Sequence, residues 1–255
     1  MSEDEEKLVR INKLLADRGL CSRREGDRLI AAGHILINGG EVAQIGQKVP
    51  EDVKLEIKSE ADSFLEERYA IALNKPVDYV SNLPQDGQRT ASELLLKENF
   101  SGELSEEKLN KVLSFQNDYA VAGRLDRASR GLLVFSNDGR VVREITQSTW
   151  CRKTYIVSVF QDVEDYHIKK LEKMRRLGKW TLLPMKVEVI GYRKLKFVLQ
   201  EGKKHQIRAV CRSVGLMVKD LYRIKIGPIE IEELASGRWR LISKEEVDYL
   251  LPKKT

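Results

Sequence analysis

Residues 120–135 read AVAGRLDRASRGLLVF and place one carboxylate, Asp126, between a glycine-bearing turn and an apolar run. The run at 131–135 is followed by an Asn-Asp-Gly turn at 137–139, which predicts a buried strand that ends there. At the start of such a strand Asp126 would be held rigidly and partly withdrawn from water. A carboxylate in that position needs a nearby cation to stay ionised and to act as a nucleophile or base. An aspartate that only caps its own turn fits these local features equally well.

The chain from residue 69 to 255 has the pattern of a single mixed domain. Four further segments are short and rich in apolar and β-branched residues, as strands are: 69–73, 154–159, 185–189 and 195–199. Helices are expected near 163–176 and at 205–213. This predicts an α+β domain built on a mixed, mainly antiparallel sheet. Residues 97–118 are polar and charge-rich, and we expect them to form a surface insertion outside the sheet.

Residues 1–60 predict a second, smaller domain that begins with two helices. Apolar residues at helical spacing indicate a short first helix ending at Gly19, namely Leu8, Ile11, Leu14 and Leu15. Ser22 stands three residues before Glu25, which is the spacing of a capping box, so a second helix should begin there. Gly33 is the expected end of that helix.

A short sheet and a linker should follow these helices. Alternating apolar residues lead into an Asn38-Gly39 hairpin turn, and alternation at 53–57 predicts a later strand. The smaller domain is therefore expected to be an α/β unit of residues 1–60. The mostly charged residues 61–68 should link it to the larger domain at 69–255.

Positive charge is concentrated in parts of the chain. The net charge is +6 and the pI about 9.1, and the cations gather in residues 7–48, 124–153 and 201–228. Such separate basic zones favour contact with the phosphates of an extended ligand. Arg23, Arg24 and Arg28 fall in the first two turns of the second predicted helix, where the helix dipole disfavours cations unless an anion lies nearby. A merely solvated charged face is the alternative.

Cysteine usage and hydropathy indicate the compartment. Cys21, Cys151 and Cys211 are far apart and odd in number, so we expect buried thiols instead of a zinc site or a disulfide framework. The start, MSEDEEK, has no apolar signal segment, and no apolar run approaches the ~20 residues of a membrane span. A reducing, cytoplasmic setting is expected.

An ordered set of motifs resembles the pseudouridine synthases of the RsuA/RluB/RluE/RluF family. The central motif is Gly123-Arg124-Leu125-Asp126 followed by Ser129 and Gly131. Five other segments match in order: Asn74-Lys75-Pro76, Lys153-Thr154-Tyr155, 202–208, 221–229 and 237–240. Residues 10–53 resemble the S4 RNA-binding module. The resemblance covers residues 8–250 and implies a small S4-like α/β RNA-binding domain followed by a pseudouridine synthase catalytic domain.

This resemblance implies a site-specific isomerase that acts on structured RNA, with rRNA a better expectation than tRNA. Uridine becomes pseudouridine when the N1–C1′ bond breaks and re-forms at C5 without redox change, so no metal or organic cofactor is required. The target base would be flipped out. A monomer is expected, with no membrane or DNA partner, because a DNA-binding regulator would need a recognition helix. A non-catalytic RNA-binding protein that keeps the fold is the rival interpretation.

Three residues would carry the chemistry if the resemblance holds. Asp126 would be the essential carboxylate, attacking the base or the sugar or promoting elimination, and the sequence does not choose among these routes. Tyr155 would stack on the detached uracil and is a candidate to remove the C5 proton, although a core aromatic on a strand is the plainer interpretation. Arg208 would supply the cation that pairs with Asp126, unless it is a surface arginine.

Other matched residues would bind the substrate. Arg124 would enter the gap left by the flipped nucleotide, with a structural ion pair as the alternative. Ile207 would line the base pocket, though a plain core residue is equally consistent. His205 would position or contact RNA. The S4-like arginines, Arg23, Arg24 and Arg28, would dock folded RNA.

The sequence departs from the family pattern at three places. Asp78 stands where the family usually has glycine, Ala128 replaces a common polar residue, and Ala209-Val210 replaces a frequent Arg-Met pair. None of these removes the predicted catalytic residues, but they weaken assignment to one particular uridine.

Overall fold

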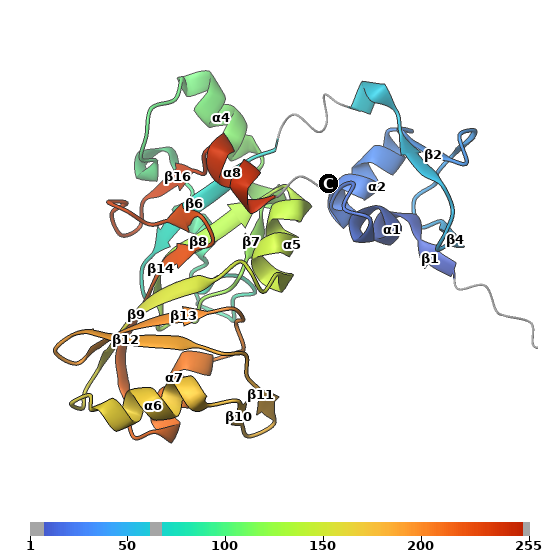
Figure 1. Ribbon diagram of the computed structural model, residues 1–255. Helices are drawn as coiled ribbons and strands as arrows, with labels where there is room; N and C mark the ends of the chain where they lie inside the picture. The colour runs from blue at the N-terminus through green and yellow to red at the C-terminus, as the bar shows by residue number, and fades with distance from the viewer. Residues whose placement is uncertain (1–7, 62–67, 252–255) are drawn as a thin grey trace, which may run out of the picture. The chain divides into compact units, whose positions relative to one another are not determined.

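The computed structural model describes residues 8–61 and 68–251, and the chain divides into two compact units (Figure 1). The smaller unit comprises the residues up to Tyr69 together with Asp138–Arg140, and the larger unit comprises the rest. The predicted linker at 61–68 falls mostly on residues 62–67, which lie outside the described part. Each unit has its own hydrophobic core.

Helices α1 and α2 and short paired strands form the smaller unit. Its elements in chain order are β1 (Leu8–Arg10), α1 (Ile11–Asp17), α2 (Arg23–Ala31), β2 (Ile35–Ile37), β3 (Glu41–Val42), β4 (Lys48–Pro50), β5 (Leu55–Ile57) and η1 (Ser59–Ala61). Strand β1 pairs with β4, while β2 pairs with both β3 and β5. The helices and strands share a core that includes Ile11, Leu15, Leu29 and Ile35.

Local sequence signals set the ends of these elements. The Ser22 hydroxyl accepts a hydrogen bond from the Glu25 amide at 3.1 Å, and the Glu25 carboxylate accepts one from the Ser22 amide at 2.6 Å, so the predicted capping box is confirmed. Asn38 and Gly39 have φ angles of 49° and 77°, the left-handed values that the predicted hairpin turn requires. The prediction for Leu8 is wrong. It lies in β1 because residues 8–10 pair with residues 48–50.

One mixed sheet dominates the larger unit (Figure 1). The strands are β6 (Ala70–Lys75), β7 (Ala120–Ala122), β8 (Arg130–Ser136), β9 (Lys153–Val159), β12 (Lys186–Gly191), β13 (Lys194–Leu199), β14 (Val218–Ile226), β15 (Ile229–Glu230) and β16 (Trp239–Leu241). Their order is β12-β13-β9-β14-β8-β6-β16, with β15 beside β14 and β7 beside β8. Only β14 and β8 pair in parallel among these described strands. The predicted α+β class with a mainly antiparallel sheet is confirmed.

Helices pack on the two halves of this sheet. Those of residues 70–251 are η2 (Ala91–Leu94), η3 (Lys97–Asn99), α4 (Glu106–Ser114), η4 (Gln116–Asp118), α5 (Gly139–Gln147), α6 (Asp165–Lys173), α7 (Gln206–Ser213) and α8 (Lys244–Leu250). Leu171 of α6 and Val210 of α7 share a core with β9, β12 and β13. Ile145 of α5 and Leu250 of α8 share another with β6 and β8. A separate hairpin joins β10 (Arg176–Leu177) to β11 (Trp180–Thr181).

The segment 97–118 lies outside the named strands but is anchored to the sheet. Phe100 forms an isolated bridge with Trp239 of β16, and their rings are 4.8 Å apart. The Tyr119 hydroxyl donates to the carbonyl of Val112, which is fully buried. The remainder of α4 is mostly exposed, so only its inner face contributes to the core.

Cys21, Cys151 and Cys211 are free and buried, as predicted. Burial raises the pKa of Cys21 and of Cys211 to about 12, so these thiols are protonated at neutral pH. Across residues 8–61 and 68–251, no helix combines the length and apolar character that crossing a membrane requires.

Candidate active site

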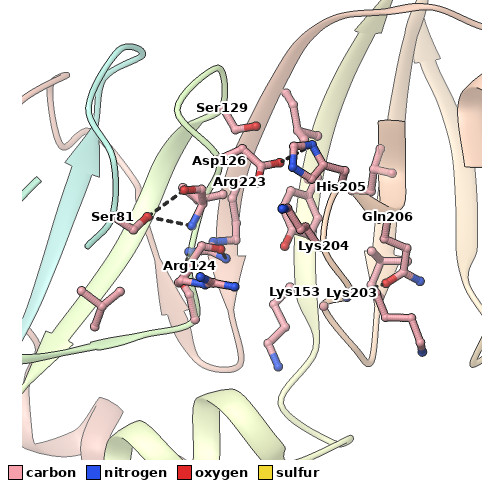
Figure 2. Close-up of a pocket in the computed structure, with 18 of the residues that line it drawn as sticks. Ser81, Arg124, Asp126, Ser129, Lys153, Lys203, Lys204, His205, Gln206 and Arg223 are labelled. Atoms are coloured by element: carbon pink, nitrogen blue, oxygen red, sulfur yellow. Dashed lines mark hydrogen bonds and ion pairs between the residues drawn. The ribbon is translucent and has the colours of Figure 1, made fainter. Parts of the chain in front are cut away.

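A pocket of about 530 Å³ opens in the larger unit beside the loop that carries Asp126 (Figure 2). Its wall comes from segments that are distant in sequence, chiefly 80–82, 121–129, 202–207, the first residues of β9 and the middle of β14. Because β8, β14 and β9 are neighbours in the sheet, these segments meet at one place. Of the residues predicted for the site, the pocket brings together Arg124, Asp126, Tyr155, His205 and Ile207.

Backbone contacts hold the loop of Asp126 between β7 and β8. The Ser81 hydroxyl donates to the Leu125 carbonyl at 2.8 Å and accepts from the Leu125 amide at 2.9 Å. The Asp78 amide donates to the Arg127 carbonyl at 2.9 Å. Both sides of Asp126 are therefore tied to residues 78–81. Sequence reasoning did not identify Ser81, because its role depends on a partner 44 positions away.

The Asp126 carboxylate itself is left available. The turn behind it is closed by the Ser129 amide, which donates to the Asp126 backbone carbonyl at 3.0 Å. No hydrogen bond among the described residues ends on the Asp126 side chain, so it does not cap its own turn. The side chain is 32% exposed, and its oxygen lies 3.7 Å from Nδ1 of His205. His205 becomes a cationic partner only when it is protonated.

Gly131 lets β8 approach β14 directly behind this loop. Its φ is 106°, and a Cβ added there would lie 2.2 Å from the Arg223 carbonyl oxygen and 2.7 Å from Cδ2 of Tyr222. Only glycine fits a position where another backbone comes so close. Gly131 of the central motif is therefore required by the packing of the two parallel strands, β8 and β14.

The predicted ion pair between Arg208 and Asp126 is not seen among the described residues. The Arg208 guanidinium instead donates to the carbonyls of Ala128 at 2.9 Å and Val218 at 3.3 Å. From its place on α7 the side chain reaches the backbone of the loop two residues beyond Asp126. This corrects the expected contact, since Arg208 meets the loop through a carbonyl and not through the carboxylate.

Arg223 of β14 is a buried cation that lines the pocket. The residue is only 2% exposed, and its guanidinium donates to the carbonyls of Leu132 at 2.7 Å and Gly123 at 2.9 Å. Its Cζ also lies 6.0 Å from the centre of the Tyr155 ring. Arg223 thus ties the loop, β8 and β9 together. The sequence signal for Arg223 was its place within the segment 221–229, where charged and apolar residues alternate as they do in a strand.

Lys75, from the Asn74-Lys75-Pro76 motif, lies just behind the site. It is fully buried, and its amine donates to the carbonyls of Pro76 at 2.7 Å and Tyr79 at 2.8 Å. Burial, together with the nearby positive charge of Arg223, lowers the pKa of Lys75 to about 8, although Asp126 and Asp78 oppose the shift. This lysine holds the chain that leads to Ser81, and it is not a pocket residue.

Two predicted pocket residues also belong to the core. Tyr155 is 7% exposed and Ile207 is 4% exposed, and both line the pocket while packing in the same cluster. The core and the site interpretations therefore both hold for these side chains. Arg124 is exposed at the pocket, and no ion pair of its side chain occurs in the described part of the chain.

The charges that line the pocket are strongly unbalanced. Asp126 is the sole acidic residue among the described lining residues. The cationic ones are Arg124, Arg127, Lys153, Lys203, Lys204 and Arg223. Lys203 forms an ion pair with Glu201, but the rest leave an excess of positive charge. Such a site favours a polyanion.

The three arginines of α2 lie in the other unit. Arg23, Arg24 and Arg28 are exposed there, and none lines the pocket. The predicted docking residues therefore belong to one unit and the predicted catalytic residues to the other.

The departure at Asp78 has a visible backbone consequence. Asp78 has a φ of 69°, in the left-handed region that favours glycine. Its carboxylate lies 3.4 Å from the Arg127 guanidinium, and both side chains are mostly exposed. The turn thus keeps the shape that a glycine would give, at some cost in strain.

Both units match known protein families. Residues 69–213 match the family described as RNA pseudouridylate synthase, and residues 9–54 match the S4 domain. A chain from Aquifex aeolicus described as an uncharacterized RNA pseudouridine synthase is 31% identical over 250 residues, covering 95% of this chain and 93% of that one. The dual-specificity RNA pseudouridine synthase RluF of Escherichia coli is 31% identical over 245 residues, covering 94% of this chain and 77% of its own.

A solved structure agrees with the fold. One described as the crystal structure of pseudouridylate synthase superposes with a TM-score of 0.64 at 23% identity, over 95% of this chain and 99% of its own. The family match at 69–213 spans more than half of the chain and contains the central motif with Asp126. The expected isomerase class and the expected RsuA/RluF-type arrangement are thereby confirmed. The chain belongs to the RNA pseudouridylate synthase family and carries an S4 domain near its N-terminal end.

Proposed function

We propose that this enzyme converts a defined uridine of structured RNA into pseudouridine, that its substrate is ribosomal RNA, and that Asp126 is its essential carboxylate. The assignment of Asp126 as the catalytic carboxylate rests on its being the one acidic residue among the described residues that line a cationic pocket. Asp126 faces that pocket from a loop fixed on both sides, while its carboxylate remains free of protein hydrogen bonds within the described residues. A functional group held by its backbone alone is preorganised for a substrate.

The reaction sets clear demands on this carboxylate. The N1–C1′ bond breaks, the C5–C1′ bond forms, C5 loses a proton and N1 gains one, so atoms and electrons balance within the substrate. Asp126 acts either as a nucleophile on the sugar or base, or as the base that starts an elimination. Each route needs an ionised carboxylate. Tyr155 offers its ring to the detached uracil and its hydroxyl to the C5 proton.

Arg208 and Arg223 act in this proposal by positioning. Arg223 holds Gly123 at one end of the Asp126 loop and Leu132 beyond its other end, and lies beside Tyr155. Arg208 holds the loop through Ala128. A loop clamped by two guanidinium groups keeps the carboxylate fixed while the substrate base turns.

Substrate binding would use both units. Arg124, exposed at the pocket, is placed to occupy the gap that a flipped nucleotide leaves, with Ile207 against the base and His205 beside Asp126. The exposed arginines of α2 would contact phosphates of the folded RNA around the target. The S4 domain and the relatives named above support RNA as the partner, and we propose the cytoplasm as the compartment where the enzyme meets it.

The test is to map pseudouridines in total RNA from cells with and without the gene. One or a few ribosomal uridines should lose the modification in the deletion strain. Wild-type protein should restore it, and Asp126→Asn protein should not. Loss confined to tRNA would overturn the ribosomal assignment, and an unchanged map would favour the non-catalytic RNA-binding alternative.

A further inference from the structure

Lys153 is a buried cation of the pocket with no partner from the protein. It begins β9, two residues before Tyr155, and is only 6% exposed. Its amine takes part in no hydrogen bond or ion pair recorded for the described residues. Figure 2 shows the side chain reaching into the pocket, with its amine directed away from Asp126.

Lys75 shows what a structural lysine looks like in the same sheet. Both lysine residues are buried, but the Lys75 amine donates to two backbone carbonyls, which compensate part of its lost hydration. Lys153 has no such acceptors. Its amine reaches into the pocket instead, where an acceptor that arrives with a ligand can meet it beside Tyr155.

The charges around Lys153 indicate that this acceptor is an anion. Burial lowers the pKa of Lys153, and the positive charge of Arg223 lowers it further. The Cys151 thiol and Glu144 oppose the shift, but burial raises the pKa of Cys151 too, so that thiol stays protonated. A neutral carbonyl of uracil would leave the repulsion between Lys153 and Arg223 uncompensated, whereas a phosphate would offset it.

Geometry favours a phosphate that belongs to the nucleotide in the pocket. Lys153 and Tyr155 are two residues apart on one strand, so their side chains lie on the same face, about 7 Å apart along it. That separation suits a base on Tyr155 and a backbone phosphate on Lys153. The cavity of about 530 Å³ has room for more than a base.

We propose that Lys153 binds a backbone phosphate next to the target uridine, so that the pocket holds the flipped nucleotide by its phosphate as well as by its base. The inference rests on the proposed use of this pocket for the uridine. Lys203 is less suited to the role because Glu201 already neutralises it, and Lys204 is exposed. Arg124, exposed at the same pocket, can assist from the solvent side.

The test compares uridine with uridine 5′-monophosphate and uridine 3′-monophosphate as probes, using NMR titration of the full-length protein. At least one monophosphate should bind the wild-type protein about 10-fold more tightly than uridine, which is the gain expected from one charge-assisted contact. Lys153→Gln should bind that monophosphate no better than uridine, with its affinity for uridine unchanged. Lys194→Gln is the control, since Lys194 is exposed on β13 and away from the pocket.

Equal binding of uridine and both monophosphates by the wild-type protein would overturn the proposal, and this comparison needs no variant. A phosphate preference that survives in Lys153→Gln would also overturn it. Failure of uridine itself to bind, or to perturb the signals of pocket residues, would instead count against the proposed function of the pocket. The two failures are therefore distinguishable.

Discussion

The loop that carries Asp126 and the helix α2 that carries the basic cluster Arg23, Arg24 and Arg28 are built in opposite ways. The loop is tied by Ser81, by Arg223 and by Arg208, so that the backbone carbonyls of residues 123–128 all accept hydrogen bonds. The arginines of α2 stand exposed on a helix that begins with a capping box. Chemistry at one bond needs a fixed group, whereas phosphate contact over a broad surface needs charge and reach.

The largest effect should come from removing the charge that the loop holds. Asp126→Asn keeps the size of the side chain and the hydrogen bonds of the loop backbone, but removes the nucleophile or base. Pseudouridine formation should fall at least about 10⁴-fold, which corresponds to more than ~5 kcal/mol of barrier. A tritium-release assay on RNA labelled at C5 of uridine measures the loss, and RNA affinity should stay within about twofold of wild type.

Asp86→Asn is the matched control, because Asp86 is an exposed loop aspartate outside the pocket. It should keep full activity. Full activity of Asp126→Asn would contradict the proposal that this loop carries the catalytic carboxylate.

The second-largest effect should come from Gly131, which lets β8 pack against β14 behind the loop. Gly131→Ala places a methyl group 2.2 Å from the Arg223 carbonyl and forces alanine into a φ of 106°. Overpacking and backbone strain together should lower the free energy of unfolding by about 3 kcal/mol or more. Urea denaturation followed by circular dichroism measures it. Gly191→Ala, which meets nothing closer than 4.0 Å and has no such φ, should change stability by less than about 1 kcal/mol.

Much of this architecture follows from short-range patterns in the sequence. The capping box of α2, the Asn38-Gly39 turn and the strand that follows Asp126 each depend on residues within a few positions, and each is seen in the structure. Strand β14 was not among the predicted elements, although it lies in the middle of the sheet. The charged residues of β14 interrupt the apolar pattern of a strand, and the partners that stabilise them are remote in the sequence. Asp220, for example, forms an ion pair at 2.8 Å with Arg130, which lies 90 positions away.

The same limit applies to the cations of the site. A motif places Arg208 near Asp126 in the chain's fold, but only the course of α7 decides that its guanidinium meets the Ala128 carbonyl. Arg223 and Lys153 are likewise distinguished by burial and by what surrounds them, which no local pattern reports. The sequence shows which charged residues the motifs contain. It does not show which group each charge contacts in the folded chain.

A smaller effect is expected at α2, where no single contact is critical. Replacing Arg23, Arg24 and Arg28 together by Gln should weaken RNA binding about 10- to 100-fold at low salt and make the slope of log affinity against log salt shallower by up to about 3. Filter binding at several salt concentrations measures both quantities. Catalytic turnover at saturating RNA should be unchanged, because the pocket lies in the larger unit.

The control for this variant removes as much charge from the larger unit. Lys169, Lys170 and Lys173 are exposed on α6, and their replacement by Gln should alter the slope much less. Equal losses in the two triple variants would mean that net charge, and not the α2 cluster, governs RNA binding.

The smallest effect concerns Asp78, which contacts Arg127 of the loop through a backbone hydrogen bond and an exposed ion pair. Asp78→Gly removes a side chain from a left-handed position and should raise the free energy of unfolding by less than about 1 kcal/mol. The ion pair with Arg127 that is lost contributes little, since the two side chains are 66% and 56% exposed. The hydrogen bond from the residue 78 amide to the Arg127 carbonyl remains, so activity should not change.

Asp78→Asn separates the two contributions at this position. Asparagine tolerates the same left-handed backbone but carries no charge, so its stability should stay at or slightly below that of the wild type. If glycine and asparagine both destabilise the protein equally, the charge of Asp78 matters more than its φ, and its attraction for Lys75 and Arg127 would be the reason. If only glycine stabilises, the loop of Asp126 is held at residue 78 by backbone shape, as it is at Leu125 by the Ser81 hydroxyl.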